Sequence, residues 1–207
     1  MYVRITRIKA SSPEELEKAR RYFVEKALPA YDGADGFLGG VFHASQEQGT
    51  AAGTTMWRDR QSMDSSEHSY TGVVEGVKEL GFEVAGVTRA EAVLREQPQP
   101  AQKGDWSRVV MVKAPEDKLP GLTEQLKQIV GEMKQLPDFR GMNAAYSRED
   151  GILSVLTVWG SREALQADEQ RRAQGRPDMI RSRGGEFLGV QIAQVLEAQV
   201  KQMAPTS

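Results

Sequence analysis

The N-terminal segment alternates hydrophobic and polar residues and then changes to a helical spacing. Residues 2–9 alternate and are rich in β-branched side chains, which predicts a strand. Ser12-Pro13-Glu14-Glu15 then supplies an N-cap, a first-turn proline and a capping-box glutamate. A helix is expected from this box to a stop formed by Pro29 with Gly33, with one apolar face formed by Leu16, Ala19, Phe23, Val24, Ala27 and Leu28.

The same reasoning predicts the other elements of the first half. Segments 37–45 and 51–57 predict two strands joined by a turn that ends at Gly49. Asp59 is expected to cap a helical region that reaches about residue 80, with a break at residues 65–70. A last strand is predicted over residues 82–94, so the element order is β-α-β-β-α-β.

The second half repeats the first at a nearly constant offset. Arg4 recurs as Arg108 and Trp57 recurs as Trp159, which are shifts of 104 and 102 residues. Small loop insertions and deletions explain the drift, and we interpret the pattern as a duplication. Strands are expected at 106–113, 139–146, 151–159 and 186–200, with a helix over 122–136 and a second helical region capped by Ser161. The predicted domains are two ferredoxin-like repeats, 1–96 and 106–201, a linker at 97–105 and a tail at 202–207.

Composition excludes several classes of site and partner. The chain has no cysteine, which excludes disulfides, thiolate nucleophiles and cysteine-ligated metals, and its two histidines cannot form a three-histidine site. A formal net charge of -2 gives no reason to expect binding to nucleic acid or to an anionic membrane. No apolar run approaches the roughly 20 residues that cross a bilayer, and charges interrupt the N-terminal segment, so we expect a cytoplasmic protein without a metal site.

One ferredoxin-like repeat leaves one face of its sheet uncovered, and two repeats can cover these faces by enclosing a barrel. The motifs at the second and third strands of each half resemble those of the dimeric α+β barrel superfamily, in particular its antibiotic-biosynthesis-monooxygenase-like group. They are Gly36-Phe37-Leu38-Gly39, Asp138-Phe139-Arg140-Gly141, Thr55-Met56-Trp57-Arg58-Asp59 and Leu156-Thr157-Val158-Trp159-Gly160-Ser161. The resemblance covers nearly the whole chain as two copies. It implies an α+β fold in which one chain forms an intramolecular pseudo-dimer, and further self-association stays open.

The resemblance implies two functions. The first is a cofactor-independent, monooxygenase-like oxidoreductase that acts on a small, aromatic molecule in the barrel lumen. The alternative is a non-catalytic barrel that binds a small ligand or has a structural role. The haem-degrading members use a histidine with a nearby asparagine and tryptophan, and no such set accompanies His68, so we predict no haem and no other cofactor.

The candidate catalytic residues lie in the first half. His43, His68 and Tyr70 are the candidates because a general base at neutral pH is most simply a histidine, and the second half has none. Arg4 and Arg108 are expected on the strand face that points away from the helices, where either guanidinium would bind an anionic oxygen of the substrate. The alternative is a surface or ion-paired arginine near a strand end.

Three further residues are candidates for substrate binding: Trp57, Asn143 and Tyr146. Trp57 has a structural alternative, because an aromatic residue that is repeated with the fold usually packs in the core. The acidic pair Asp168-Glu169 is expected at a helix start or a turn, where capping and solvation explain it.

Overall fold

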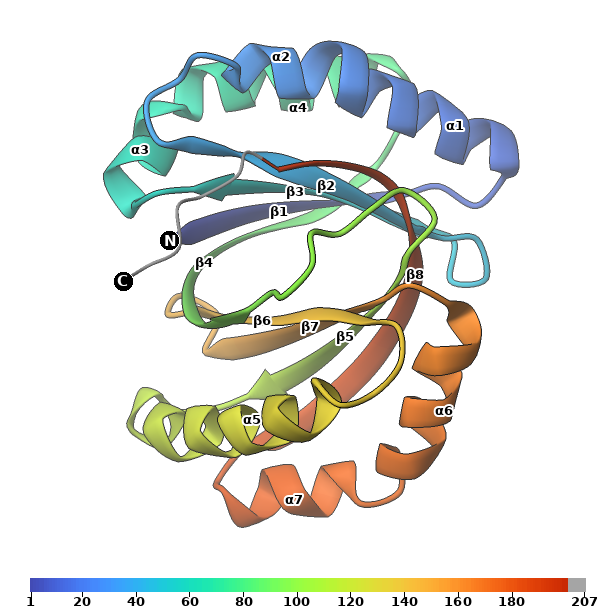
Figure 1. Cartoon of the computed structure of the whole chain (residues 1–207). Coiled ribbons are helices and arrows are strands. Elements are labelled where there is room, and N and C mark those ends of the chain that lie inside the picture. The colour runs from blue at the N-terminus through green and yellow to red at the C-terminus, as the bar shows by residue number, and fades with distance from the viewer. Residues whose placement is uncertain (201–207) are drawn as a thin grey trace. The chain divides into compact units, whose positions relative to one another are not determined.

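The computed structural model describes residues 1–200, so the predicted tail and residue 201 lie outside the described residues. The first half contains strands β1 (Tyr2–Lys9), β2 (Phe37–Ser45), β3 (Thr50–Trp57) and β4 (Val84–Glu96), with helices α1 (Pro13–Tyr22), α2 (Leu28–Tyr31), α3 (Arg60–Ser65) and α4 (Glu67–Glu79). The second half contains strands β5 (Trp106–Lys113), β6 (Phe139–Ser147), β7 (Ile152–Trp159) and β8 (Glu186–Val200), with helices α5 (Leu119–Met133), α6 (Arg162–Arg172) and α7 (Arg176–Ser182). Figure 1 shows these elements.

The hydrogen-bonded strand order confirms the predicted fold class. The order is β1-β3-β2-β8-β5-β7-β6-β4, which is the connectivity of a closed barrel. Each half has the element order β-α-β-β-α-β once its helices are included. The chain is therefore an α+β protein made of two ferredoxin-like repeats.

The chain divides into two compact units that share the last strand of each repeat. The first unit holds Met1–Arg89 together with residues 195–200 of the described chain, and the second holds Ala90–Gln194. β4 and β8 each begin in one unit and end in the other. Each unit therefore has three complete strands and parts of two more.

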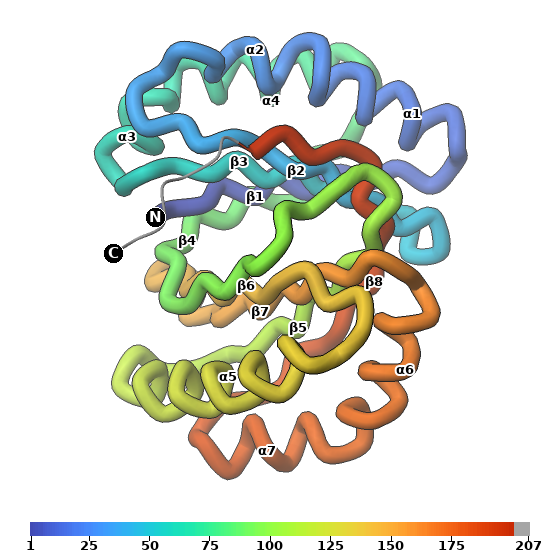
Figure 2. Tube along the Cα trace, in the orientation of Figure 1, coloured from blue at the N-terminus to red at the C-terminus, as the bar shows by residue number. Residues whose placement is uncertain are grey.

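The first unit packs its helices on one face of its sheet. β3 lies between β1 and β2, and Arg4 in β1 pairs with Thr55 in β3. Trp57 at the end of β3 is fully buried, with its ring centroid 5.1 Å from Phe37 and 5.4 Å from Tyr31. This aromatic cluster joins the end of the sheet to α2, and α1 and α2 form one continuous helical segment (Figure 2).

The second unit repeats this packing. β7 lies between β5 and β6, and Arg108 in β5 pairs with Thr157 in β7. Trp159 is fully buried, 5.3 Å from Phe139 between ring centroids. α5, α6 and α7 provide the helix layer of this unit (Figure 1).

The structure adds detail to two predicted helical regions. The first helical segment ends at Tyr31, between the predicted stop residues Pro29 and Gly33, and a π-helical turn over Phe23–Ala27 places Pro29 in the first turn of α2, where its missing N–H is tolerated. The break in the second helical region is confined to Ser66, the residue between α3 and α4. Among residues 1–200, no helix has the length and apolar character needed to cross a membrane.

Candidate functional site

The arginine of each first strand points toward the helix layer, so the predicted orientation is wrong. Arg4 is 1% exposed. Its guanidinium donates to Ser66 Oγ at 3.0 Å, to the Met63 carbonyl oxygen at 2.8 Å and to Glu67 Oε2 at 2.9 Å. All three acceptors belong to α3, α4 or the residue between them. Both faces of β1 contain buried residues, and alternation alone therefore did not identify the face that meets the helices.

Arg108 makes the corresponding contacts in the second unit. It is 2% exposed, and its Nη2 and Nη1 atoms lie 2.9 Å from Asp168 Oδ2 and 2.9 Å from Glu169 Oε2. Asp168 and Glu169 occupy the positions 102 residues after Ser66 and Glu67, so the duplicated arginine has a duplicated set of partners. Asp168 is 0% exposed in the middle of α6, which corrects the expectation that this acidic pair lies at a helix start or a turn.

A cavity of about 310 Å³ lies between the sheet and the helices of the second unit. Its walls are aliphatic on both sides. β5, β6 and β7 contribute Val110, Val112, Met142, Leu153 and Val155, and the helices contribute Leu122, Leu126, Ile129, Met133, Met179 and Ile180. No aromatic side chain lines this cavity. The volume is at the lower end of the range for small-molecule sites, and apolar walls with a few convergent polar groups are typical of them.

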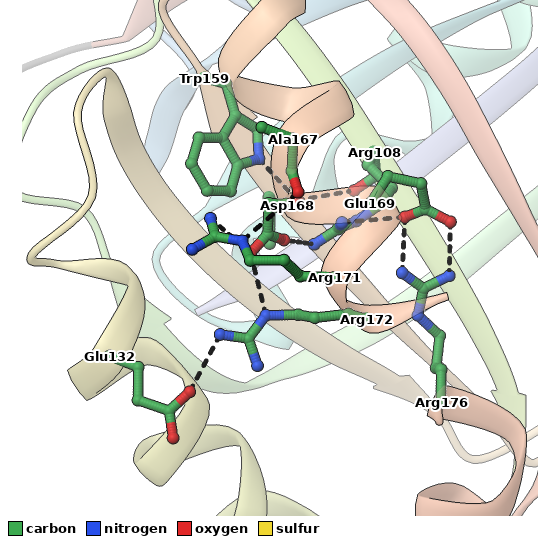
Figure 3. Close-up of polar contacts among 10 residues, drawn as sticks. Arg108, Glu132, Trp159, Ala167, Asp168, Glu169, Arg171, Arg172 and Arg176 are labelled. Atoms are coloured by element: carbon green, nitrogen blue, oxygen red, sulfur yellow. Dashed lines mark hydrogen bonds and ion pairs between the residues drawn. The ribbon is translucent and has the colours of Figure 1, made fainter. Parts of the chain in front are cut away.

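The polar groups of this cavity are mostly arginines. Arg108, Arg171, Arg172 and Arg176 line it together with Glu132. Figure 3 shows how the acidic partners connect these arginines, with Asp168 near Arg108 and Arg172, and Glu169 near Arg108 and Arg176.

The carboxylates of Asp168 and Glu169 hold the arginines without lining the cavity. Arg172 Nε donates to Asp168 Oδ1 at 2.9 Å, and Arg176 donates to both oxygens of Glu169 at 2.9 and 2.5 Å. Burial raises the pKa of Glu169, but Arg176 and Arg108 outweigh it and leave this pKa below its ordinary value. Four guanidinium groups therefore line the cavity, while two of the three carboxylates that pair with them, Asp168 and Glu169, do not.

The corresponding space in the first unit is almost filled. Its cavity measures about 50 Å³ and is lined by Arg4, Thr6 and several aromatic rings: Tyr22, Phe23, Tyr31, Phe42, Tyr70 and Phe82. The Phe23 ring lies over two glycines of the sheet, since a Cβ atom added at Gly40 or Gly53 would meet it at 2.9 and 3.0 Å. The positions 102 residues later are Met142 and Val155, which line the larger cavity.

The structure does not bring the three candidate catalytic residues together. Tyr70 lines the small cavity, where its ring lies 4.3 Å from the Arg4 guanidinium and its hydroxyl 3.3 Å from Thr6 Oγ1. His68 is exposed on α4 and lines neither cavity. His43 follows the cavity-lining Phe42 on β2 and so lies on the opposite face of the sheet. Burial lowers the pKa of His43 to about 4.

The candidate substrate-binding residues are also dispersed. Trp57 lines neither cavity, and its Nε1 donates to Thr55 Oγ1 at 3.1 Å. Tyr146 is buried and donates to the Ala114 carbonyl oxygen at 2.9 Å. Asn143 follows the cavity-lining Met142 and lies on the opposite face of β6, with a buried Oδ1 that has no hydrogen-bond partner among the described residues. Arg108 is the one candidate that lines the larger cavity.

Sequence reasoning missed Arg172, Arg176 and Glu132. The segment Arg171-Arg172-Ala173-Gln174-Gly175-Arg176 has the composition of a solvated helix end, which hides the burial of Arg176. The sequence did contain one signal: Arg4 and Glu67 both recur in the second half, as Arg108 and Glu169. Among residues 1–200, no group of three or more histidine, aspartate or glutamate side chains is arranged to hold a metal ion.

Relatives with a similar sequence cover most of the chain. An uncharacterized protein of Mycobacterium tuberculosis, found in two strains, is 21% identical over 189 residues, which are 91% of this chain and 84% of the relative. No family profile matches the chain.

Solved structures cover the chain more completely. A protein of Fusobacterium nucleatum named "putative monooxygenase" has a TM-score of 0.71 at 9% identity, and covers 97% of this chain and 94% of its own. An "anthrone oxidase-like protein" has a TM-score of 0.66 at 12% identity, with 100% and 96% covered. A Listeria monocytogenes ferredoxin-fold protein related to antibiotic biosynthesis monooxygenases has a TM-score of 0.56 at 4% identity, with 94% and 95% covered.

This chain shares the α+β barrel fold of these proteins. The agreement confirms the resemblance that the strand motifs indicated. An antibiotic-biosynthesis-monooxygenase-like fold does not by itself identify a reaction or a substrate, because one fold carries many functions. Function has to be inferred from the cavity of the second unit.

Proposed function

We propose that the protein binds a small organic molecule in the cavity between the sheet and the helices of the second unit. The observation that carries this proposal is the cavity of about 310 Å³, with aliphatic walls and arginines that line it. A void of this size with apolar walls costs stability, since its lining atoms lose their packing partners. A bound ligand would restore these contacts. The corresponding space between the sheet and the helices of the first unit measures only about 50 Å³.

A monooxygenase-like oxidoreductase is the second candidate function, and the names of the structural neighbours favour it. A cofactor-independent oxidation of this class needs a pocket, a base and a partner for an anionic oxygen. In the second unit Arg108 and Arg176 would stabilise the anionic oxygen. Glu132 is the one carboxylate that lines the cavity and would accept the proton. Glu132 already has an ion-pair partner, Arg172, at 3.0 Å.

Haem does not fit the described side chains. An axial histidine would have to face a cavity, but His68 is exposed on α4 and His43 lies on the opposite face of β2 from the first cavity. The second unit has no histidine. We therefore propose that the protein works without haem and, as expected from the sequence, in the cytoplasm.

The binding proposal can be tested with a neutral fluorescent dye, N-phenyl-1-naphthylamine. We expect one saturable site in the wild-type protein. Leu126→Trp places an indole in the cavity and should abolish this site. Leu188→Trp makes the same change at a side chain that is 44% exposed and should leave binding unchanged.

Absence of saturable binding, or equal binding by both variants, would refute the proposal. Oxygen consumption should then be measured with each ligand found. Turnover that is lost in Leu126→Trp would favour the oxidoreductase over the non-catalytic binding protein.

A further inference from the structure

The arginine-lined end of the second cavity indicates the charge of its ligand. Four guanidinium groups line this cavity, and three carboxylates pair with them: Glu132, Asp168 and Glu169. The group as a whole retains one positive charge. Because two of the three carboxylates do not line the cavity, its interior faces more positive charge than negative charge.

One buried donor in this group lacks an acceptor. Arg108 uses Nη1 and Nη2 for Glu169 and Asp168, but its Nε has no hydrogen-bond partner among the described residues. An unpaired guanidinium donor in a buried position is costly, and an anionic oxygen is the strongest acceptor for it. Arg176, also buried, lines the same cavity, so two nearly inaccessible cations are held beside it.

The walls indicate the body of the ligand. They consist of valine, leucine, isoleucine and methionine side chains, with three methionines: Met133, Met142 and Met179. Aromatic ligands are usually held by stacking on aromatic side chains, and none lines this cavity. Methionine is unbranched and adapts to ligands of irregular or variable shape. Such walls fit a flexible aliphatic chain better than a planar ring system.

We infer that the ligand is an aliphatic monocarboxylate, with its carboxylate at Arg108 and Arg176 and its hydrocarbon chain between the sheet and α5. The terminal nitrogens of both arginines already contact Asp168 or Glu169, so the Nε of Arg108 is the unpaired donor for a ligand carboxylate, and Arg176 adds a second positive charge beside it. A single negative charge balances the single excess positive charge of the cluster. Arg171 and Glu132 are exposed at this end of the cavity, so a ligand can enter there. This inference rests on the binding function proposed above.

Calorimetric titration with octanoate, compared with the uncharged 1-octanol, tests the inference. We expect one octanoate per chain and an affinity for 1-octanol that is weaker by about ten-fold, because one charge-assisted contact typically has this effect. Arg176→Gln should remove the preference for octanoate. Arg181→Gln makes the same change on the exposed side of α7 and should retain the preference.

The neutral dye separates the two proposals. If the dye binds to Arg176→Gln as to wild type, the cavity is intact, and the loss of octanoate binding reports the charge alone. Equal affinities for octanoate and 1-octanol, or a preference that survives in Arg176→Gln, would overturn the monocarboxylate while the binding function stands. Failure of dye, octanoate and 1-octanol to bind at all would overturn both.

Discussion

Removing the buried carboxylate of Asp168 should destabilise the protein far more than removing the exposed carboxylate of Glu67, the acidic partner of Arg4 in the first unit. Asp168→Asn removes the negative charge and replaces one of the two acceptor oxygens by an NH2 group. At most one of the contacts to Arg108 Nη2 and Arg172 Nε, both at 2.9 Å, can then be kept. The side chains of Arg108 and Asp168 are almost inaccessible to solvent. Removing one partner of a buried ion pair costs about 3–5 kcal/mol. Here the change leaves Arg108 with Glu169 as its one carboxylate and Arg172 with Glu132.

The duplication supplies the control for this experiment. Arg4 is as buried as Arg108, but its acidic partner Glu67 is 48% exposed. In Glu67→Gln, Arg4 keeps Ser66 Oγ and the Met63 carbonyl oxygen as acceptors. Water can also reach the position of the lost carboxylate. The expected cost is about 1 kcal/mol or less, as for other half-exposed pairs.

Urea unfolding monitored by tryptophan fluorescence measures the free energy of unfolding of both variants. Thermal unfolding gives a second measurement: for a chain of this length each kcal/mol corresponds to about 2–4 °C, so Asp168→Asn should lower the melting temperature by roughly 6–20 °C. Glu67→Gln should lower it by at most about 4 °C. Equal losses of stability in the two variants would show that burial does not decide the strength of these pairs, and the reasoning would be wrong.

Three further predictions concern the first unit. Burial lowers the pKa of His43 from 6.5 to about 4. As the pH falls, the unfolded chain therefore takes up this proton at a higher pH than the folded chain. The contribution of His43 to the free energy of unfolding should be complete above pH 6.5 and should fall by about 3 kcal/mol as the pH drops to 4. Denaturation at several pH values should show a smaller fall in His43→Gln than in His68→Gln, and equal falls would contradict this. Phe23→Ala should cost about 3–5 kcal/mol in urea unfolding, because it empties the space over the glycines of the sheet; a loss below about 1 kcal/mol would mean that the helices collapse into this space. Gly36→Ala should destabilise more than Gly33→Ala in thermal unfolding, because both glycines have positive φ but only at Gly36 would the Cβ lie 2.2 Å from Ser62 Oγ; equal effects would contradict the steric argument.

The fold was accessible from the sequence because its signals are local. Alternation, the capping box at Ser12 and the repeat of Trp57 as Trp159 each report on short segments, and the structure confirms the resulting element order. The capping box itself is formed, since Ser12 Oγ accepts the Glu15 N–H and Glu15 accepts the Ser12 N–H. Helix ends were less certain, because a π-helical turn before Pro29 has no clear sequence signature.

The candidate site was only partly accessible, because it depends on which strand face meets the helices. Both faces of β5 contain buried residues, so alternation did not reveal that Arg108 points toward α6. The charged residues of α6 and α7 resembled a solvated surface until the structure placed Asp168 and Arg176 in contact with buried groups. Cavity volume also cannot be read from the sequence, since Phe23 fills the space between sheet and helices in the first unit, while no aromatic ring lines the corresponding cavity of the second.

The contrast between the filled and the open cavity has a consequence for how this protein can change. In an assembly of two identical chains, each substitution is present in both copies, so a phenylalanine that closes one cavity also closes the other. Here one chain encodes both units, and each position can vary alone. The first unit can acquire a stable aromatic core that contributes most of the free energy of folding, while the second keeps the less stable, open space that a ligand needs. Selection can therefore adjust stability and specificity at separate residues.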